Sequence, residues 1–209
     1  MKVSALFFII FAFMLTVVSA QEEQVDQQEM MKKWQEYMTP GDVHKHMQTA
    51  EGEWNADMKF WMAPGTEPAV STGETSIKMI LGGRYLQMTH KGVVMGMPTE
   101  GMSIESYDND KKEFTSIWID NMGTGMMISK GTISDDMKTI NYSGLMYDPM
   151  SGSDIKTRQV STMVDENTMK FEMFQEFNGA EFKSMEILYK RKYLLITKFN
   201  HDIANKANE

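Results

Sequence analysis

The chain has 209 residues, no cysteine and a formal net charge of −8 at pH 7, with 29 acidic against 21 basic side chains. The absence of cysteine excludes disulfides and thiolate metal sites, so the fold must rely on its own core. The acidic balance disfavours nucleic acid and anionic lipid as partners, because both bind clustered Lys and Arg, and no such cluster occurs before residue 190.

Residues 1–20 have the pattern of a secretory signal peptide. Lys2 precedes an apolar run over residues 6–15, and Val18-Ser19-Ala20 has the small side chains of a cleavage site. The run is shorter than the roughly 20 apolar residues that span a bilayer. We therefore expect cleavage before Gln21, export to the periplasm or the medium, and no integral membrane segment after cleavage. An uncleaved anchor is the alternative.

Residues 21–50 are expected to form a helical lead-in of one or two helices. The segment from Glu22 to Met38 lacks Gly and Pro, and large apolar residues recur in it at helical spacing: Met30, Trp34, Tyr37 and Met38. A second short helix is expected after Thr39-Pro40-Gly41-Asp42, with Thr39 as its cap. This helix carries His44 and His46, which are too close in sequence to chelate one metal from a regular helix. We expect both on the solvated surface.

Residues 51–192 are expected to form an all-β, antiparallel up-and-down barrel of about ten strands, followed by a polar tail over residues 193–209. Turn residues such as Asp108-Asn109-Asp110 separate long runs of alternating apolar and polar side chains. Closure of the barrel would remove the exposed edges of such long strands. Some strands are mixed on both faces, as between Phe114 and Asn121, which indicates a partly polar interior or a strand covered on its outside by the lead-in helix.

Two short motifs open and close the barrel region. Gly52-Glu53-Trp54 begins its first strand, and Lys190-Arg191-Lys192 ends its last. This combination is typical of calycin-type barrels, in which an indole fills the closed end and a cation lies across its face. We predict that Trp54 and Arg191 form this closure.

The region from Gly41 to Lys192 resembles a bacterial family catalogued as domain of unknown function 1579, which is placed among the calycin-like (lipocalin-like) β-barrels. The segments that carry the resemblance are Gly41-Asp42-Val43-His44-Lys45, Gly52-Glu53-Trp54, Gly82-Gly83-Arg84-Tyr85-Leu86, Ser106-Tyr107-Asp108, Trp118-Ile119-Asp120-Asn121-Met122, Tyr147-Asp148-Pro149 and Met185-Glu186-Ile187-Leu188-Tyr189-Lys190-Arg191-Lys192. The resemblance implies a β-barrel and no particular activity.

Residues that would support catalysis are scarce. The sequence lacks a Cys nucleophile, a Gly-x-Ser-x-Gly elbow, a phosphate-binding loop and a His-x-x-x-His pair, so we predict no catalytic residue, no metal site and no cofactor. An enzyme that uses internal carboxylates such as Asp120 and Glu172 is the least favoured function. His90 shares strand parity with Leu86 and Met88; it is either a buried histidine with an ordinary hydrogen bond or an axial ligand for haem.

Methionine is unusually abundant, with 23 residues in the chain. Several are clustered, in Met95-Gly96-Met97, Met122 and Met126-Met127. Thioether sulfur is a soft ligand that suits Cu(I), so copper handling stays open as an alternative. Methionine is also an adaptable filler of irregular apolar cavities, and we expect that role for most of these side chains.

The function that the sequence favours is binding of a small hydrophobic or amphipathic molecule inside the barrel. Such pockets are mostly apolar with a few placed polar groups. The candidate lining residues are Met88, Tyr107, Trp118 and Met126, and the candidate polar anchors are Arg84, Asp120 and Arg158. Two alternatives remain: an internal Arg–Asp pair with no ligand role, and a solidly packed barrel that serves as an interaction or structural protein. The oligomeric state does not follow from the sequence.

Overall fold

The computed structural model describes residues 26–192. The expected signal peptide and C-terminal tail lie outside this range. The chain divides into two compact units, residues 1–39 and residues 40–209. None of the described helices is long and apolar enough to cross a membrane.

The described part of the first unit is a helix over residues 26–38. Its predicted apolar stripe is exposed, and Trp34 and Tyr37 meet edge to face with their ring centroids 6.1 Å apart. Ion pairs one turn apart, Glu29 with Lys33 and Lys32 with Glu36, support the helix.

The second unit begins with α2 (Asp42–Gln48), whose N-cap is Gly41 rather than the predicted Thr39. Thr39 instead donates its hydroxyl hydrogen to the carbonyl of Gln35, 2.5 Å away, in the last turn of the preceding helix. The prediction for His44 was also wrong, because this side chain is buried. Its Nδ1 accepts a hydrogen bond from the Gly41 N–H at 3.1 Å, and its ring lies edge-on to Tyr107 at 5.9 Å.

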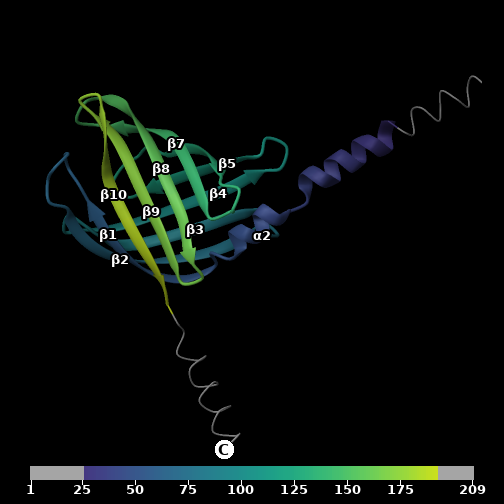
Figure 1. Ribbon diagram of the computed structural model, residues 1–209, viewed down its shortest axis with the longest axis horizontal. Helices are drawn as coiled ribbons and strands as arrows, with labels where there is room; N and C mark the ends of the chain where they lie inside the picture. The colour runs from purple at the N-terminus through teal and green to yellow at the C-terminus, as the bar shows by residue number, and fades with distance from the viewer. Residues whose placement is uncertain (1–25, 193–209) are drawn as a thin grey trace, which may run out of the picture. The chain divides into compact units, whose positions relative to one another are not determined.

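Ten antiparallel strands follow and form a closed barrel (Figure 1). They are β1 (Gly52–Phe60), β2 (Ala69–Ile80), β3 (Tyr85–Val94), β4 (Met97–Asp108), β5 (Glu113–Asp120), β6 (Met127–Ile133), β7 (Thr139–Asp148), β8 (Ser153–Asp165), β9 (Thr168–Phe177) and β10 (Ala180–Arg191). Each strand pairs with its neighbours in sequence, and β1 pairs with β10 from Trp54↔Arg191 to Phe60↔Met185. The predicted up-and-down barrel is therefore confirmed.

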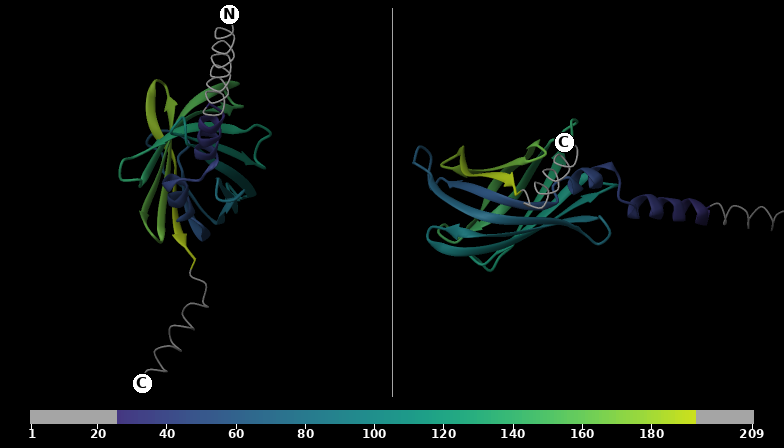
Figure 2. Two further views of the ribbon diagram at one scale, coloured as in Figure 1. Left: turned by 90° about the vertical axis from the view of Figure 1, so that its right-hand side faces the viewer. Right: turned by 90° about the horizontal axis from the view of Figure 1, so that it is seen from below.

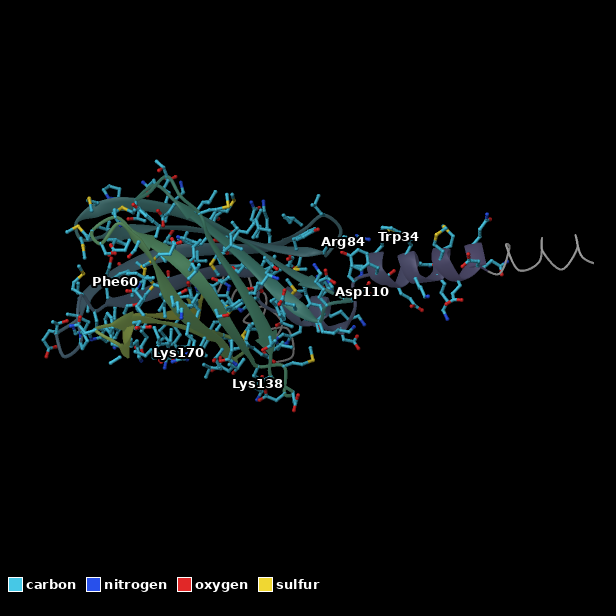
Figure 3. The ribbon with its side chains drawn as sticks, turned by 90° about the horizontal axis from the view of Figure 1, so that it is seen from above. Trp34, Phe60, Arg84, Asp110, Lys138 and Lys170 are labelled. Atoms are coloured by element: carbon cyan, nitrogen blue, oxygen red, sulfur yellow. The ribbon has the colours of Figure 1, made fainter. Side chains whose placement is uncertain are left out.

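The alternating strand directions give the barrel two ends with different coverings. One end, called here the Trp54 end, carries the turns after β2, β4, β6 and β8, together with α2, which contacts β2 and β3 (Figure 2). The loops after β1, β3, β5, β7 and β9 form the opposite end, called here the far end. Phe60 marks the far end and Arg84 and Asp110 mark the Trp54 end in Figure 3. Within residues 40–192, α2 is the only helix, so the far end has no helical cover.

The Trp54 end is plugged by an indole and a guanidinium group. The Trp54 side chain is fully buried, and its Nε1–H donates to the carbonyl of Ala50 at 3.0 Å. The Arg191 guanidinium lies 4.1 Å from the centroid of the Trp54 ring, within the range of a cation–π contact. Arg191 also donates to the carbonyls of Thr49 and Glu166, each at 2.8 Å, so it ties β10 to the chain before β1 and to the β8–β9 turn.

Gly52 explains the Gly-x-Trp spacing. Its φ of +135° lies in a region that favours glycine, and a Cβ atom at this position would be 2.7 Å from Nη1 of Arg191. Glycine therefore leaves the space in which the arginine crosses the indole.

The apolar core is concentrated next to this plug. Trp54, Ala56, Met58 and Phe60 alternate with exposed polar residues on β1, which fixes the inward face of that strand. The other buried members of the core come from α2, from the turn after it and from the Trp54 ends of the remaining strands: Met47, Ala50, Ile77, Leu86, Phe114, Tyr142, Met169, Ile187 and Tyr189.

Truncation of the plug tests its contribution to stability. Trp54→Ala should lower the free energy of unfolding by about 3–5 kcal/mol, the usual cost of truncating a buried aromatic side chain. Urea unfolding followed by circular dichroism gives this value. The matched control is Trp34→Ala, at an exposed tryptophan, for which we expect a change within about 0.5 kcal/mol. A loss below about 1 kcal/mol for Trp54→Ala would rule out a plugged end.

Candidate functional site

The candidate site is the part of the barrel interior that lies beyond the apolar core. Fully buried Phe114 fixes the inward parity of β5, so Ser116 and Trp118 point inside as well. Ser116 pairs with Glu105 and Trp118 with Ser103, which fixes the inward face of β4. These inward side chains are only half-buried.

A hydrogen bond between Glu105 and Tyr142 crosses the interior from β4 to β7. The Tyr142 hydroxyl donates to Oε2 of Glu105. Its ring lies over Gly131 of β6, where a Cβ atom would be 2.5 Å from Cδ1 of the tyrosine. Phe114 meets the same ring edge-on at 6.3 Å, on the side of the apolar core. The Glu105–Tyr142 pair is therefore the first polar layer above the core.

The surroundings disfavour negative charge on both members of this pair. Burial raises the pKa of the Glu105 carboxyl above its ordinary value, and the hydrogen bond from Tyr142 offsets part of that effect. Burial also raises the pKa of the Tyr142 hydroxyl well above its ordinary range, and the nearby carboxyl reinforces the shift. Within the described residues, the side-chain carboxyl of Glu105 has one hydrogen-bond partner, the Tyr142 hydroxyl.

Polar side chains continue across β6 and β8 as one wall of the interior. Gln159 donates through Nε2 to the hydroxyl of Ser129 at 2.9 Å and lies 3.4 Å from the hydroxyl of Thr157, and all three side chains are buried. Gly144 lies between them on β7, where a Cβ atom would be 2.4 Å from Oγ of Ser129. The absence of a side chain at Gly144 lets this hydrogen-bonded row form.

The opposite wall, on β1, β9 and β10, is apolar. Between β1 and β10, Met58 lies opposite Ile187 and Phe60 opposite Met185. Between β10 and β9, Ile187 lies opposite Phe171 and Met185 opposite Met173. The interior therefore has one apolar wall and one polar wall, so its lining is amphipathic.

Trp118 and Asp120, two of the predicted ligand-binding residues, contact each other toward the far end. The Trp118 Nε1–H donates to Oδ2 of Asp120 at 2.7 Å, and Oδ1 of the same carboxylate accepts the N–H of Met122 at 2.9 Å. The indole lies over Gly101 of β4, where a Cβ atom would be 2.3 Å from the ring. The glycine thus allows the indole to lie flat along the interior wall.

Two further predicted residues lie nearer the apolar core. Tyr107 packs between His44 and Phe114, with its ring centroid 4.9 Å from that of Phe114. Met88 is opposite Ile77 and is half-buried against the core. Both face inward at the base of the interior, on the Trp54 side of Trp118.

Arg84, Met126 and Arg158 do not line the interior. Arg84 is exposed in the β2–β3 turn and donates to the carbonyl of Leu81 at 3.3 Å, and Met126 is exposed in the β5–β6 loop. Arg158 points outward because its neighbours on β8 occupy the inward positions. Its guanidinium binds both carboxylate oxygens of Glu181, at 2.8 and 2.6 Å, so its predicted role as an internal anchor was wrong.

Glu172, the other carboxylate that an enzyme was expected to use inside the barrel, also faces outward. Its Oε1 lies 2.6 Å from Nζ of Lys183 and 2.9 Å from Nζ of Lys170, in an ion-pair network on the outer face of β9 and β10. Asp120 and Glu172 therefore do not form the pair of internal carboxylates that this enzyme would need.

His90 points inward on β3 and is buried. Its Nδ1 is 2.9 Å from the hydroxyl of Thr75, and its ring packs on Gly73 and Gly92. Its Nε2 has no hydrogen-bond partner among the described residues. Burial lowers the pKa of the imidazole, which favours its neutral form. Of the two interpretations of His90, the geometry matches the buried histidine with an ordinary hydrogen bond.

The clustered methionines lie at the far end. Met95 and Met97 flank the β3–β4 turn, while Met122 and Met126 belong to the β5–β6 loop, and all four are exposed. Among residues 26–192, no group of three or more His, Asp and Glu side chains is placed to hold a metal ion. Binding of Cu(I) by the thioethers stays a prediction of the sequence.

Comparison with known proteins identifies a family but no activity. The profile of the family described as "Protein of unknown function (DUF1579)" matches residues 39–191. No curated protein matches the chain. The crystal structure of Rv2717c from M. tuberculosis is similar with a TM-score of 0.57 at 11% identity, over 74% of this chain and 100% of that one. A redesigned β-barrel has a TM-score of 0.38 at 13% identity, over 71% of this chain and 96% of its own. At these identities, the likeness to Rv2717c shows the fold alone.

The raised pKa of Glu105 predicts a measurable pH dependence of stability. In the unfolded wild type, the Glu105 carboxyl loses its proton as the pH rises through 4.5, its ordinary pKa, whereas in the folded state it keeps the proton to higher pH. Between these two pKa values, the free energy of unfolding of the wild type should therefore fall relative to that of Glu105→Gln as the pH rises. Glutamine keeps the acceptor for the Tyr142 hydroxyl and removes the titration.

Urea unfolding of both proteins across a pH series measures this difference, and the contributions of the other titrating groups cancel in it. Glu100→Gln removes a carboxyl from an exposed position of the same strand and is the matched control for the substitution itself. A wild-type minus Glu105→Gln difference that is flat, or that rises with pH, would contradict the assignment.

Proposed function

We propose that this chain, which belongs to the DUF1579 family of proteins of unknown function, is an exported barrel that binds a small amphipathic molecule in its interior. The proposal of export rests on the signal-peptide pattern of residues 1–20. The proposal of binding rests on the amphipathic interior, and above all on Glu105. A carboxyl held inside the barrel with a single hydrogen-bond partner is costly for a purely structural role.

Three observations support an interior that takes a ligand rather than one that is packed solid. The inward residues Ser103, Glu105, Ser116 and Trp118 retain exposed surface. They lie opposite an apolar wall, a combination that suits a molecule with one polar and one apolar side. Glycine residues at positions 101 and 131 bring the Trp118 and Tyr142 rings flat against the wall, where they take less of the interior.

A neutral hydrophobic probe tests binding inside the barrel. N-phenyl-1-naphthylamine should become fluorescent when it is bound by the mature protein. Ser116→Phe, which adds a large side chain to the inward face of β5, should remove most of this signal because it fills the proposed site. Circular dichroism and the melting temperature of the variant establish that it is folded.

Thr115→Phe is the matched control, because the adjacent position on the same strand faces outward. It should bind the probe as the wild type does. Equal loss of fluorescence in both variants, or no binding by the wild type, would contradict a site inside the barrel.

Export has its own direct test. Protein recovered from its native host should lack residues 1–20, and N-terminal sequencing should begin at Gln21. A chain that retains Met1 would show that the segment is not removed.

A further inference from the structure

We propose that the ligand of this barrel is a cationic amphiphile, an amine with an apolar body, whose charged nitrogen pairs with Glu105. This inference rests on the proposed function and names the ligand class of the same site. It follows from the signs of the charges that face the interior, from the single partner of Glu105, and from the position of Trp118.

The inward charges beyond the apolar core are all acidic in the described strands. Glu105 lies in the body of β4, and Asp120 and Asp148 occupy inward-parity positions at the far ends of β5 and β7. The inward-facing base is Arg191, which is held at the Trp54 end by the indole and by backbone carbonyls. Burial lowers the pKa of His90, the remaining inward-facing basic group on the described strands, and so favours its neutral form.

The lysines of the strands face outward, and several are in ion pairs there. Lys130 lies 2.7 Å from Glu113, and Lys183 lies 2.6 Å from Glu172 and 2.7 Å from Glu186. The described interior therefore presents carboxyl groups to a ligand and no cation of its own close to Glu105. This charge balance favours a positive ligand and disfavours an anionic one.

Glu105 is placed to recognise an ammonium group. The Tyr142 hydroxyl that donates to Glu105 is neutral, so the ionised form of this carboxyl has no opposite charge beside it among the described residues. A buried carboxylate is stabilised when it is paired, and an ammonium group can donate a charge-assisted hydrogen bond to it. A ligand of this class thus supplies the partner that the protein itself does not provide.

The rest of the lining suits the same ligand. The Trp118 indole is half-buried on the inner wall, and indole is the side chain that attracts cations most strongly through its ring face. The apolar wall of Met58, Phe60, Met173 and Met185 is available to the hydrocarbon part. A fatty acid would instead bring its carboxylate close to Glu105 and Asp120, where like charges repel.

Three compounds with the same ten-carbon chain test the inference: decylammonium, decanol and decanoate. Each is titrated against bound N-phenyl-1-naphthylamine at about pH 8, where the amine keeps its proton. Wild-type protein should bind decylammonium more tightly than decanol, and decanol more tightly than decanoate. Glu105→Gln should weaken decylammonium binding by about tenfold and leave decanol binding unchanged, because it removes only the charge of the pair.

Glu100→Gln separates this local effect from the attraction of any cation to an acidic protein. It removes the same charge from an exposed, outward position of the same strand and should keep the wild-type order of affinities. If Glu105→Gln does not fold, the order of the three compounds on the wild type still decides the question.

The outcomes distinguish this inference from the function on which it rests. If the wild type does not bind the neutral probe, the proposed function fails and the inference fails with it. If the probe binds but decanol or decanoate displaces it as well as decylammonium does, only the cationic class is overturned. The same holds if Glu105→Gln retains the preference for decylammonium.

Discussion

The contact between the Arg191 guanidinium and the Trp54 indole is the interaction on which the rest of the structure depends. It joins the first and last strands at the pair that closes the barrel, Trp54↔Arg191. The same guanidinium donates to Thr49, just after α2, and to Glu166 in the β8–β9 turn. One side chain thereby holds together three segments that are far apart in sequence, and glycine at position 52 provides the space for it.

This plug determines how the interior is layered. The buried apolar side chains gather around Trp54, so the core of the protein occupies one end of the barrel. The Glu105–Tyr142 pair lies directly above the core, and beyond it the wall on β4–β8 is polar while the wall on β1, β9 and β10 is apolar. Stability and ligand recognition can therefore reside in different parts of one barrel, with Phe114 and Tyr142 at the boundary between them.

The sequence predicted the barrel well because alternation, turn chemistry and the Gly-x-Trp motif are local signals. It grouped Trp118 and Asp120 on one strand face for the same reason, since both residues share the parity of buried Phe114. Arg158 and Glu172 could not be placed, because alternation gives two faces without saying which one is inside. Their outward orientation follows from buried Thr157 and Gln159 on β8 and buried Met169 and Met173 on β9. Glu105 was missed because a glutamate is expected to face solvent, although it shares parity with Tyr107, which was expected to line the interior.

Crystals of the mature protein grown with decylammonium would test the central claim most directly. We predict electron density for the amine inside the barrel, with its nitrogen at hydrogen-bond distance from the Glu105 carboxylate and its chain against the Met58 and Met173 wall. An interior in which the apolar and polar walls meet without space for a ligand, or an amine bound only on the outer surface, would contradict the account.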